Sequence, residues 1–357
     1  MKFMGLIAPV GSPITTVGGT STALQQVANR PIVCHVLDAL QRSGVTEVVL
    51  LTAAADTEDL RACIAAEGPE QLAVEYVPYA EDSFERGLRA ASRVLGDSPL
   101  VVHAADGLLV QPLAPLLELL GSGTHDLLAL VHRQPIANGS VALATRRVLR
   151  LAGASHEESA LELAGVCLLG EGALGEALQT RAWRNPELDL AAVAERLASW
   201  GRRVGVQHIG GWRRNRGTVE DLLELNRIAF DALPREHAPS LAAALTSQEA
   251  ANRLEGYVEV HPTARLHASV IVGPARVGPG AEVTDSYIGP YTSIGAGARI
   301  ESAEVERSII MPGASIMHIG GRLVGSVVGR DARIFRDFSL PRALRVNVGD
   351  GNEVALC

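Results

Sequence analysis

One aspartate ends a strand-like apolar stretch in a position suited to chemistry. Asp106 closes PLVVHAAD at residues 99–106, which has the composition of a buried strand. Open α/β sheets bind ligands at the carboxyl ends of their strands, and Mg²⁺ prefers carboxylate oxygens. Asp106 is therefore a candidate catalytic carboxylate and metal ligand; an exposed strand-end carboxylate without a ligand is the alternative. His103 precedes it, and strand alternation predicts that this ring packs on the opposite face.

A run of arginines is the second group that could do chemistry. Arg213, Arg214 and Arg216 flank Asn215 in GWRRNRG. A guanidinium binds phosphate and carboxylate oxygens through parallel N–H donors. The run therefore predicts a site for an anionic ligand, and a solvated approach to the next helix is the alternative.

The opening stretch has the layout of a phosphate loop. GLIAPVGSPITTVGGTSTALQQVANRP, residues 5–31, contains a strand-like run, a glycine-spotted loop and a helix start near Asn29 and Pro31. Glycines let backbone N–H groups approach an anion closely. Yet no lysine or arginine lies between Lys2 and Arg30, and Lys2 is the only lysine in the chain. The loop has the glycines of a phosphate site without its cations.

The elements that must position these residues alternate between strand and helix signals up to about residue 230. The strand-like runs are TEVVLLT at 46–52, AVEYV at 73–77, PLVVHAAD at 99–106, DLLALV at 126–131 and RVGVQHI at 203–209. Asn29 is a candidate N-cap for the first helix, and Thr218 begins another with a capping-box-like sequence. Alternation of this kind predicts a mostly parallel sheet with helices on its faces.

The periodicity changes after residue 255. From Val260 on, small or branched apolar residues recur about every six positions, with Gly, Ala, Ser and Pro between them. A six-residue repeat predicts a parallel β-helix, and an antiparallel β-domain is the alternative. We therefore expect an α/β domain at 1–232, a helical connector at 233–255 and a β-helix at 256–357.

Composition excludes several classes of partner. The 357 residues carry a net charge of −8, which offers no basic face to nucleic acid or to an anionic membrane surface. The opening apolar stretch is too short for a secretory core, and no segment has the ~18 apolar residues of a membrane span. The cysteines lack CxxC spacing, so we expect neither disulfides nor zinc. These features favour a cytoplasmic protein that binds a small molecule.

An α/β domain followed by hexapeptide repeats resembles the sugar-1-phosphate nucleotidyltransferases, in detail the long, two-domain glucose-1-phosphate thymidylyltransferases. The resemblance is carried by VANRPIVCHVLDALQRSGVTEVVLLT, VVHAADGLLV, LAGVCLLG, RGTVEDLLELNRIAFDAL, VTDSYIGPYTSIGAGARIESAEVERSII and RALRVNVGDGNEVAL. It implies a Rossmann-like nucleotidyltransferase sheet, a left-handed β-helix and a homo-oligomer. It also implies a sugar phosphate or nucleotide sugar as the ligand.

The triphosphate loop departs from the family pattern. That pattern is G-G-x-G-T-R-L, followed by a lysine that completes the clamp. Gly11 and Ser12 fall within the corresponding loop, Pro13 stands at the arginine position, and the lysine position falls near Thr22. Nucleotidyl transfer develops negative charge that preplaced cations must stabilise. We therefore interpret the loop as a phosphate loop stripped of its charge.

The metal site departs in the same direction. The family holds magnesium with one aspartate after a strand and another in W-x-D-x-G. Asp106 matches the first, whereas Asn215 stands at the second. An amide offers an oxygen without the charge that a hard dication prefers. Mg²⁺ remains a possible cofactor only if the ligand contributes its own phosphates.

The recognition positions have also changed. The family's stretch that reads base and sugar becomes PYAEDSFERG here, with Tyr79, Phe84 and Arg86 at altered positions. The two aromatic rings either narrow the base pocket or pack in the core, and Arg86 either enters the pocket or is solvated. The family's E-K-P aligns with residues 153–155, which are Gly-Ala-Ser. Gly165 and Glu187 match the family and have either structural or ligand-binding roles.

These departures predict a diverged homologue that has lost the cationic triphosphate clamp and the second metal ligand. Such a protein is unable to carry out ordinary nucleotidyl transfer and serves another reaction, a ligand or a partner. One alternative is an active enzyme that forms a nucleotide sugar, with Asp106 and substrate phosphates holding the metal. Another is a structural partner of a true nucleotidyltransferase.

Overall fold

The computed structural model describes residues 2–9, 16–17, 20–80, 83–133, 139–153, 161–179, 188–233 and 252–336. The chain divides into two compact units. The first comprises residues 1–25 and 31–214, and the second comprises residues 26–30 and 215–357. Within the described ranges, no helix is long and apolar enough to cross a membrane.

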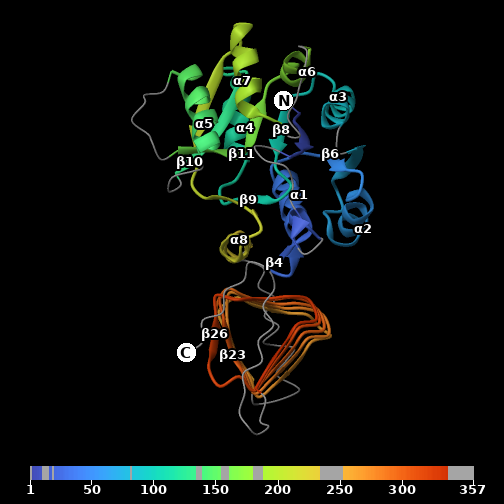
Figure 1. Ribbon diagram of the computed structural model, residues 1–357, viewed down its shortest axis with the longest axis vertical. Coiled ribbons are helices and arrows are strands. Elements are labelled where there is room, and N and C mark those ends of the chain that lie inside the picture. Colours follow the sequence, from blue (N-terminus) through green and yellow to red (C-terminus); the bar gives the residue numbers. More distant parts are fainter. Residues whose placement is uncertain are drawn as a thin grey trace. The chain divides into compact units, whose positions relative to one another are not determined.

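The first unit is built on a seven-stranded sheet (Figure 1) with the order β12-β10-β11-β8-β1-β6-β7. In chain order the strands are β1 (Met4–Ile7), β6 (Glu47–Ala53), β7 (Ala73–Tyr79), β8 (Leu100–His103), β10 (Leu127–Arg133), β11 (Leu161–Leu169) and β12 (Val204–His208). β11 runs antiparallel to both of its neighbours, and the other neighbouring pairs are parallel. The predicted mostly parallel sheet is therefore confirmed.

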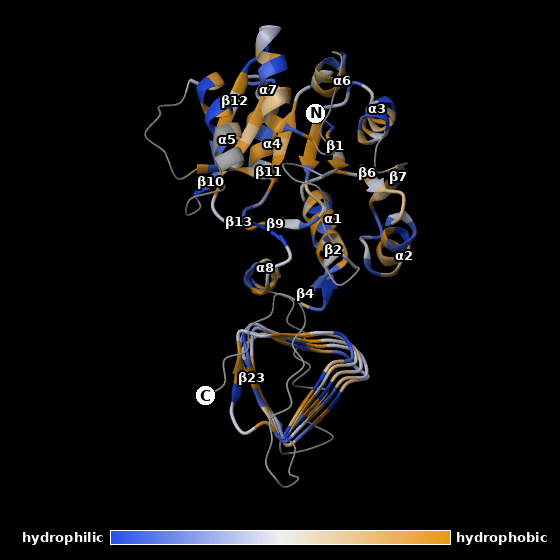
Figure 2. Cartoon of the chain, in the orientation of Figure 1, coloured by the Kyte–Doolittle hydropathy of each residue, from blue (hydrophilic) through white to orange (hydrophobic). Residues whose placement is uncertain are grey.

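Most strands of this sheet are rich in apolar residues because they are buried on both faces, whereas most residues of the edge strand β7 are not buried. Every residue of β8 is buried, and every residue of β10 except the last is buried. Figure 2 shows the sheet strands as mainly hydrophobic between helices of mixed polarity. The apolar core of the first unit therefore lies on both sides of the sheet.

The helices that accompany the sheet are α1 (Ile32–Arg42), α2 (Thr57–Glu67), α3 (Phe84–Leu95), α4 (Ala114–Gly121), α5 (Gly139–Leu151), α6 (Ala173–Leu178) and α7 (Leu190–Ser199). α7 begins at Asp189, whose Oδ1 accepts hydrogen bonds from the backbone N–H groups of Ala191 and Ala192. Such a cap satisfies donors that have no partner inside the helix.

The predicted N-cap of the first helix was wrong. Ala28 and Asn29 have φ values of 48° and 60° and form the tip of a hairpin between β4 (Gln26–Val27) and β5 (Arg30–Pro31). Two consecutive residues with positive φ are typical of a tight hairpin turn, a conformation that an N-cap does not adopt. Pro31 instead stands at the N-cap of α1.

A small antiparallel ladder connects distant parts of the first unit. β9 (Gly107–Leu109) pairs with β13 (Trp212–Arg214), so that Arg214 lies opposite Gly107 and Trp212 opposite Leu109. The ladder follows directly after β8. It therefore brings the arginine run beside the end of the strand that carries Asp106.

The second unit is a left-handed parallel β-helix, as predicted (Figure 1). Its three five-stranded sheets have the orders β14-β17-β20-β23-β26, β15-β18-β21-β24-β27 and β16-β19-β22-β25-β28. The strands are β14 (Arg253–Glu255), β15 (Val258–Val260), β16 (Arg265–His267), β17 (Val270–Val272), β18 (Ala275–Val277), β19 (Glu282–Thr284), β20 (Tyr287–Ile288), β21 (Thr292–Ile294), β22 (Arg299–Glu301), β23 (Glu304–Glu306), β24 (Ile309–Ile310), β25 (Ser315–Met317), β26 (Arg322–Val324), β27 (Val327–Val328) and β28 (Arg333–Phe335). Ile271, Ile288 and Val305 stack in register and are 0% exposed, which explains the apolar repeat.

α8 (Val219–Asp231) belongs to the β-helix unit. Thr218 caps it as predicted, because its Oγ1 accepts a hydrogen bond from the Asp221 N–H at 3.1 Å. The Asn226 side chain accepts from the Ala28 N–H at 2.7 Å and donates to the Tyr291 carbonyl at 2.8 Å. The predicted domain limits at 232 and 255 stay a prediction, since most of the expected connector lies outside the described residues.

Candidate functional site

Asp106 lies just beyond β8 and is 1% exposed. One carboxylate oxygen, Oδ1, accepts a hydrogen bond from Arg214 Nε at 2.8 Å. The other, Oδ2, accepts one from Thr22 Oγ1 at 3.1 Å. Both oxygens of the candidate metal ligand are therefore engaged by side chains of the same unit.

Each partner of Asp106 is positioned by a short element. Arg214 is the last residue of β13 and pairs with Gly107 of β9. Gly107 directly follows Asp106 in the sequence, so the pairing brings Arg214 close to Asp106. Thr22 begins the short 3-10 helix η1 (Thr22–Leu24) and is fully buried. The side chains thus converge from three segments that are far apart in the sequence.

The two opposite charges in this cluster, on Asp106 and Arg214, compensate each other. The Arg214 side chain is 8% exposed, so the carboxylate and the guanidinium form a buried ion pair. A buried charge is costly unless it is paired and hydrogen-bonded, and removing one member leaves the other uncompensated. Arg214 therefore neutralises Asp106 from within the protein.

This arrangement does not fit a magnesium ion. A dication at Asp106 would share Oδ2 with the hydrogen bond from Thr22 and would lie beside the Arg214 guanidinium, which carries the same sign of charge. Asn215 is 1% exposed, and its Oδ1 accepts a hydrogen bond from the Gly217 N–H at 3.0 Å. In the described ranges, no group of three or more His, Cys, Asp or Glu side chains is placed to hold a metal ion.

The indole of Trp212 covers two glycines next to this cluster. A Cβ added at Gly107 would lie 2.4 Å from the indole, and one added at Gly165 would lie 2.7 Å from it. Trp212 itself is 7% exposed. Gly165 therefore has a packing role, because only glycine leaves room for the ring.

His103 packs in the interior, as predicted. Its ring meets that of Trp212 edge-on with centroids 5.5 Å apart, and its Nδ1 donates to the Ala104 carbonyl at 2.7 Å. Burial lowers the pKa of His103 from 6.5 to about 4, opposed in part by that hydrogen bond. The ring is therefore neutral at physiological pH.

Two aromatic side chains predicted near the base pocket contact each other. Tyr79 ends β7 and Phe84 begins α3, and their rings meet edge-on at 5.3 Å. Phe84 is 3% exposed. The pKa of Tyr79 is raised mainly by burial and, to a smaller extent, by the nearby charge of Asp56. These rings fill space between strand and helix. Arg86, on the same helix, is exposed to solvent.

Comparison with known proteins identifies the family. No family model matches the chain. A glucose-1-phosphate thymidylyltransferase of Streptomyces antibioticus is 30% identical over 100% of this chain and 99% of that protein. The chain belongs to the glucose-1-phosphate thymidylyltransferase family. A second such enzyme, from Streptomyces griseus, is 29% identical over 98% of both chains.

Two further proteins are similar to this chain at lower identity. The low-salt glycan biosynthesis nucleotidyltransferase Agl11 of Haloferax volcanii is 25% identical over 100% of both chains. The crystal structure of a putative glucose-1-phosphate thymidylyltransferase from Bacillus anthracis in complex with a sucrose superposes with a TM-score of 0.52 at 15% identity. It covers 66% of this chain and 96% of its own. The superposition shows that the fold is shared.

Part of the family site lies outside the described residues. Gly11, Ser12, Pro13 and Glu187 are among these, so their predicted roles stay predictions. Of the predicted site residues that are described, the structure joins Thr22, Arg214 and Asp106 in one cluster and places Tyr79 and Phe84 together elsewhere.

Sequence reasoning missed Trp212 and the ion pair between Arg214 and Asp106. The available signal was the position of the tryptophan directly before the arginine run, together with glycines at 107 and 165. Those glycines have no turn to explain them: each lies in a strand, where glycine often marks a close approach of another group.

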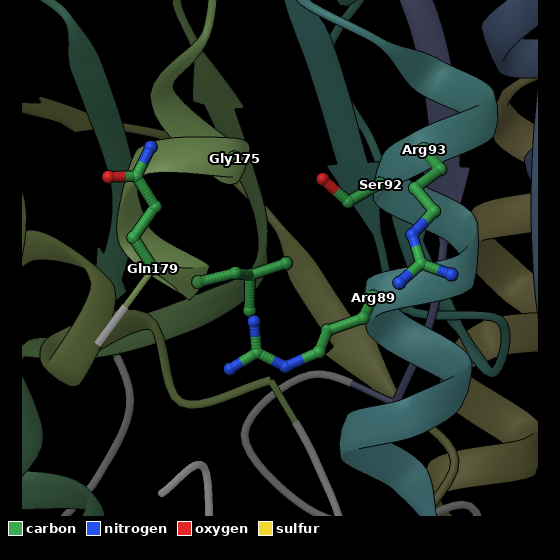
Figure 3. Close-up of a pocket in the computed structure, with 6 residues that line it drawn as sticks. Arg89, Ser92, Arg93, Gly175 and Gln179 are labelled. Carbon is green, nitrogen blue, oxygen red and sulfur yellow. The ribbon is translucent and has the colours of Figure 1, made fainter. Parts of the chain in front are cut away.

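A separate hollow lies between α3 and α6 (Figure 3). It is lined by Arg89, Ser92, Arg93, Gly175, Leu178 and Gln179. The Arg89 guanidinium, which reaches toward the α6 side of the hollow, donates to Glu85 Oε1 through Nε at 2.9 Å and Nη2 at 2.8 Å. None of the predicted ligand-pocket residues lines this hollow.

Proposed function

We propose that this chain is a sugar-1-phosphate nucleotidyltransferase homologue that does not carry out magnesium-dependent nucleotidyl transfer and acts by binding a ligand or a partner. The observation that carries the proposal is the buried contact of Asp106 with Arg214 and Thr22. The carboxylate that would hold the metal is neutralised by the chain itself.

The chemistry of transfer explains why this contact matters. A sugar phosphate attacks the α-phosphorus of a nucleoside triphosphate, pyrophosphate leaves, and negative charge builds on the phosphate oxygens. Losing one well-placed group that stabilises such charge costs about 10²–10³ in rate. Here the metal ligand is occupied, and Pro13 and Thr22 stand where the resemblance places cations.

An active enzyme is the second candidate. The similarity to glucose-1-phosphate thymidylyltransferases over the full chain favours it, as does the retention of Asp106. For this enzyme to work, substrate phosphates would have to draw Arg214 away from Asp106 and help to hold the metal. The product would then be a nucleotide sugar.

Pyrophosphate release by the pure protein separates these candidates. The reaction contains glucose-1-phosphate, one nucleoside triphosphate at a time and Mg²⁺, with Asp106→Asn as the matched variant. We expect no release above that of the variant. Robust Mg²⁺-dependent release by the wild-type protein that disappears in Asp106→Asn would overturn the proposal in favour of the active enzyme.

Binding is tested separately by thermal stability. Glucose-1-phosphate and nucleotide sugars would raise the unfolding free energy by about 2.7 kcal/mol at a hundredfold excess over the dissociation constant. Stabilisation without turnover supports a binding role. Failure of every such ligand, together with co-purification of an active nucleotidyltransferase, would favour a partner protein instead. We further propose a homo-oligomer, which native mass measurement tests.

A further inference from the structure

Two thiols lie in contact inside the first unit. The Sγ atoms of Cys34 and Cys63 are 3.8 Å apart, although the residues are 29 positions apart in the sequence. Cys34 lies in the first turn of α1, and Cys63 lies in the second half of α2. Both are reduced in the structure. A disulfide bond would require the sulfurs to approach from this distance to ~2.05 Å.

The pair is asymmetric in its exposure. Cys34 is 0% exposed, whereas Cys63 is partly exposed. A reagent from solvent therefore reaches Cys63 first. Cys34 is then the neighbouring thiol that can react with whatever forms on Cys63.

The Tyr76 ring lies near the pair. The Arg61 guanidinium, on the same helix as Cys63, lies 4.3 Å from the centroid of the Tyr76 ring. Burial is the main factor that raises the pKa of Tyr76, Arg61 opposes it, and both thiols lie close enough to contribute. The reactive form of each cysteine is the thiolate.

We propose that Cys34 and Cys63 form a reversible disulfide that ties α1 to α2 when a low-molecular-weight disulfide is present. The Cys63 thiolate attacks one sulfur of that oxidant, forms a mixed disulfide and releases one small thiolate. The Cys34 thiolate then attacks Cys63 Sγ, the mixed bond breaks, and the second small thiolate leaves. The protons of both cysteine thiols are released, and the oxidant is reduced to two thiols.

The bond would act on a lightly anchored helix. In α2, only Thr57 and Leu60 are buried, whereas α1 buries six of its residues. A helix with few buried contacts is able to open locally at low cost. A disulfide restricts that opening and also lowers the conformational entropy of the unfolded chain. The oxidised protein should therefore be more stable than the reduced protein. In the cytoplasm that the sequence favours, the reduced pair is the resting state.

Cys167 provides an internal control. It lies in β11, is 0% exposed, and burial raises the pKa of its thiol far above the usual value. It should remain a thiol under conditions that oxidise the pair. The fourth cysteine, Cys357, lies outside the described residues, so the experiment is done in a Cys357→Ser background as well as in the wild-type protein.

The full-length reduced protein is treated with oxidised glutathione, alkylated under denaturing conditions and analysed by intact and peptide mass spectrometry. We expect the loss of two alkylatable thiols, a peptide linking Cys34 to Cys63, and a higher unfolding midpoint that dithiothreitol reverses. Cys34→Ser should instead accumulate one glutathione on Cys63. Because Cys34 is buried, Cys63→Ser at the more exposed position serves as a second variant and should retain both other described thiols.

Three results would overturn the proposal. The first is that both thiols stay alkylatable in the wild-type protein at every oxidant concentration that modifies a free cysteine peptide. The second is a glutathione adduct on Cys63 that persists although Cys34 is present. The third is a linked peptide that joins either cysteine to Cys167 or Cys357 instead.

Discussion

At the scale of single residues, the candidate metal-binding carboxylate is paired with a guanidinium. The Asp106 oxygens that would face a cation from solution face Arg214 and Thr22 instead. A planar guanidinium satisfies a carboxylate with directed hydrogen bonds and cannot be deprotonated in a protein. Arg214 therefore balances the charge of the Asp106 carboxylate without a metal ion.

Replacing Arg214 should be severely destabilising. Arg214→Met keeps much of the side-chain volume but leaves Asp106 buried without its counter-charge, which typically costs about 3–5 kcal/mol. Urea denaturation measures the loss in the free energy of unfolding. The exposed Arg216→Met change should cost less than about 0.5 kcal/mol. Adding Asp106→Asn to Arg214→Met should recover much of the loss, and a double variant as unstable as Arg214→Met alone would contradict this account.

Two substitutions test whether Arg214 excludes a metal ion. Arg214→Met combined with Asn215→Asp removes the internal cation and restores a carboxylate at the position that the resemblance assigns to the second ligand. We expect Mg²⁺ to raise the unfolding midpoint of this double variant and to leave that of the wild-type protein unchanged. Equal responses of both proteins to Mg²⁺ in differential scanning calorimetry would mean that Arg214 does not exclude the metal.

His103 should make the protein sensitive to acid. Its pKa falls from 6.5 to about 4 on folding, so the unfolded chain binds the proton more tightly. The stabilisation is fully present above pH 6.5 and is lost as the pH falls toward 4. One pKa unit corresponds to about 1.4 kcal/mol, which gives a total of about 3 kcal/mol.

The measurement is the difference in unfolding free energy between pH 7 and pH 4.5 for the wild type and for His103→Gln. The difference should be smaller in the variant because the glutamine does not titrate. An unchanged dependence in His103→Gln would show that other groups cause it.

At the scale of elements, the β9 and β13 ladder creates the site. It holds Arg214 opposite Gly107 and, two residues earlier, sets the Trp212 ring against the glycines of two other strands. The close approach excludes side chains at Gly107 and Gly165. The ladder therefore fixes both the ion pair of Arg214 with Asp106 and the position of the Trp212 ring beside it.

Gly165→Ala tests that close approach. The new methyl group would lie 2.7 Å from the Trp212 ring and 2.9 Å from the Ala104 Cβ, so either the indole or the strand must shift. Overpacking of this kind typically costs about 1–3 kcal/mol. Gly175→Ala in α6 meets nothing within 4 Å and should be neutral or stabilising. Thermal unfolding of the two variants compares them directly, and equal midpoints would refute the packing role.

Elements whose sequence pattern lies within a short window were predictable. Elements fixed by contacts between distant residues were not. The apolar runs that became β6, β8 and β10 and the repeat that became the β-helix are patterns within short windows. The hairpin tip at Ala28 and Asn29 was mistaken for a helix cap, because its turn is fixed by contacts with residues far along the chain. The pair of Arg214 with Asp106 was likewise invisible, since it depends on a register between strands about a hundred residues apart.

At the scale of the whole molecule, the chain has the architecture of its family. Both the sheet and the β-helix are complete among the described residues, and similarity to the thymidylyltransferases extends over the full chain. Core packing alone maintains such a fold, whereas nucleotidyl transfer requires specific charged groups. Selection on assembly or on ligand binding would preserve the fold without preserving those charged groups.

Asn226 joins segments from opposite ends of the chain within the β-helix unit. Its carboxamide accepts from the Ala28 N–H and donates to the Tyr291 carbonyl, so Asn226→Ala leaves a buried donor and an acceptor without their partner. Each such loss costs about 1–3 kcal/mol. Asn226→Asp keeps the acceptor for Ala28 but loses the donor to Tyr291, and the aspartate charge adds repulsion from that carbonyl. A smaller loss in Asn226→Asp than in Asn226→Ala would show that the bond to Ala28 contributes, because only the aspartate keeps it. Equilibrium unfolding that leaves both variants within about 0.5 kcal/mol of the wild type would mean that the segment at residues 26–30 is held by other contacts.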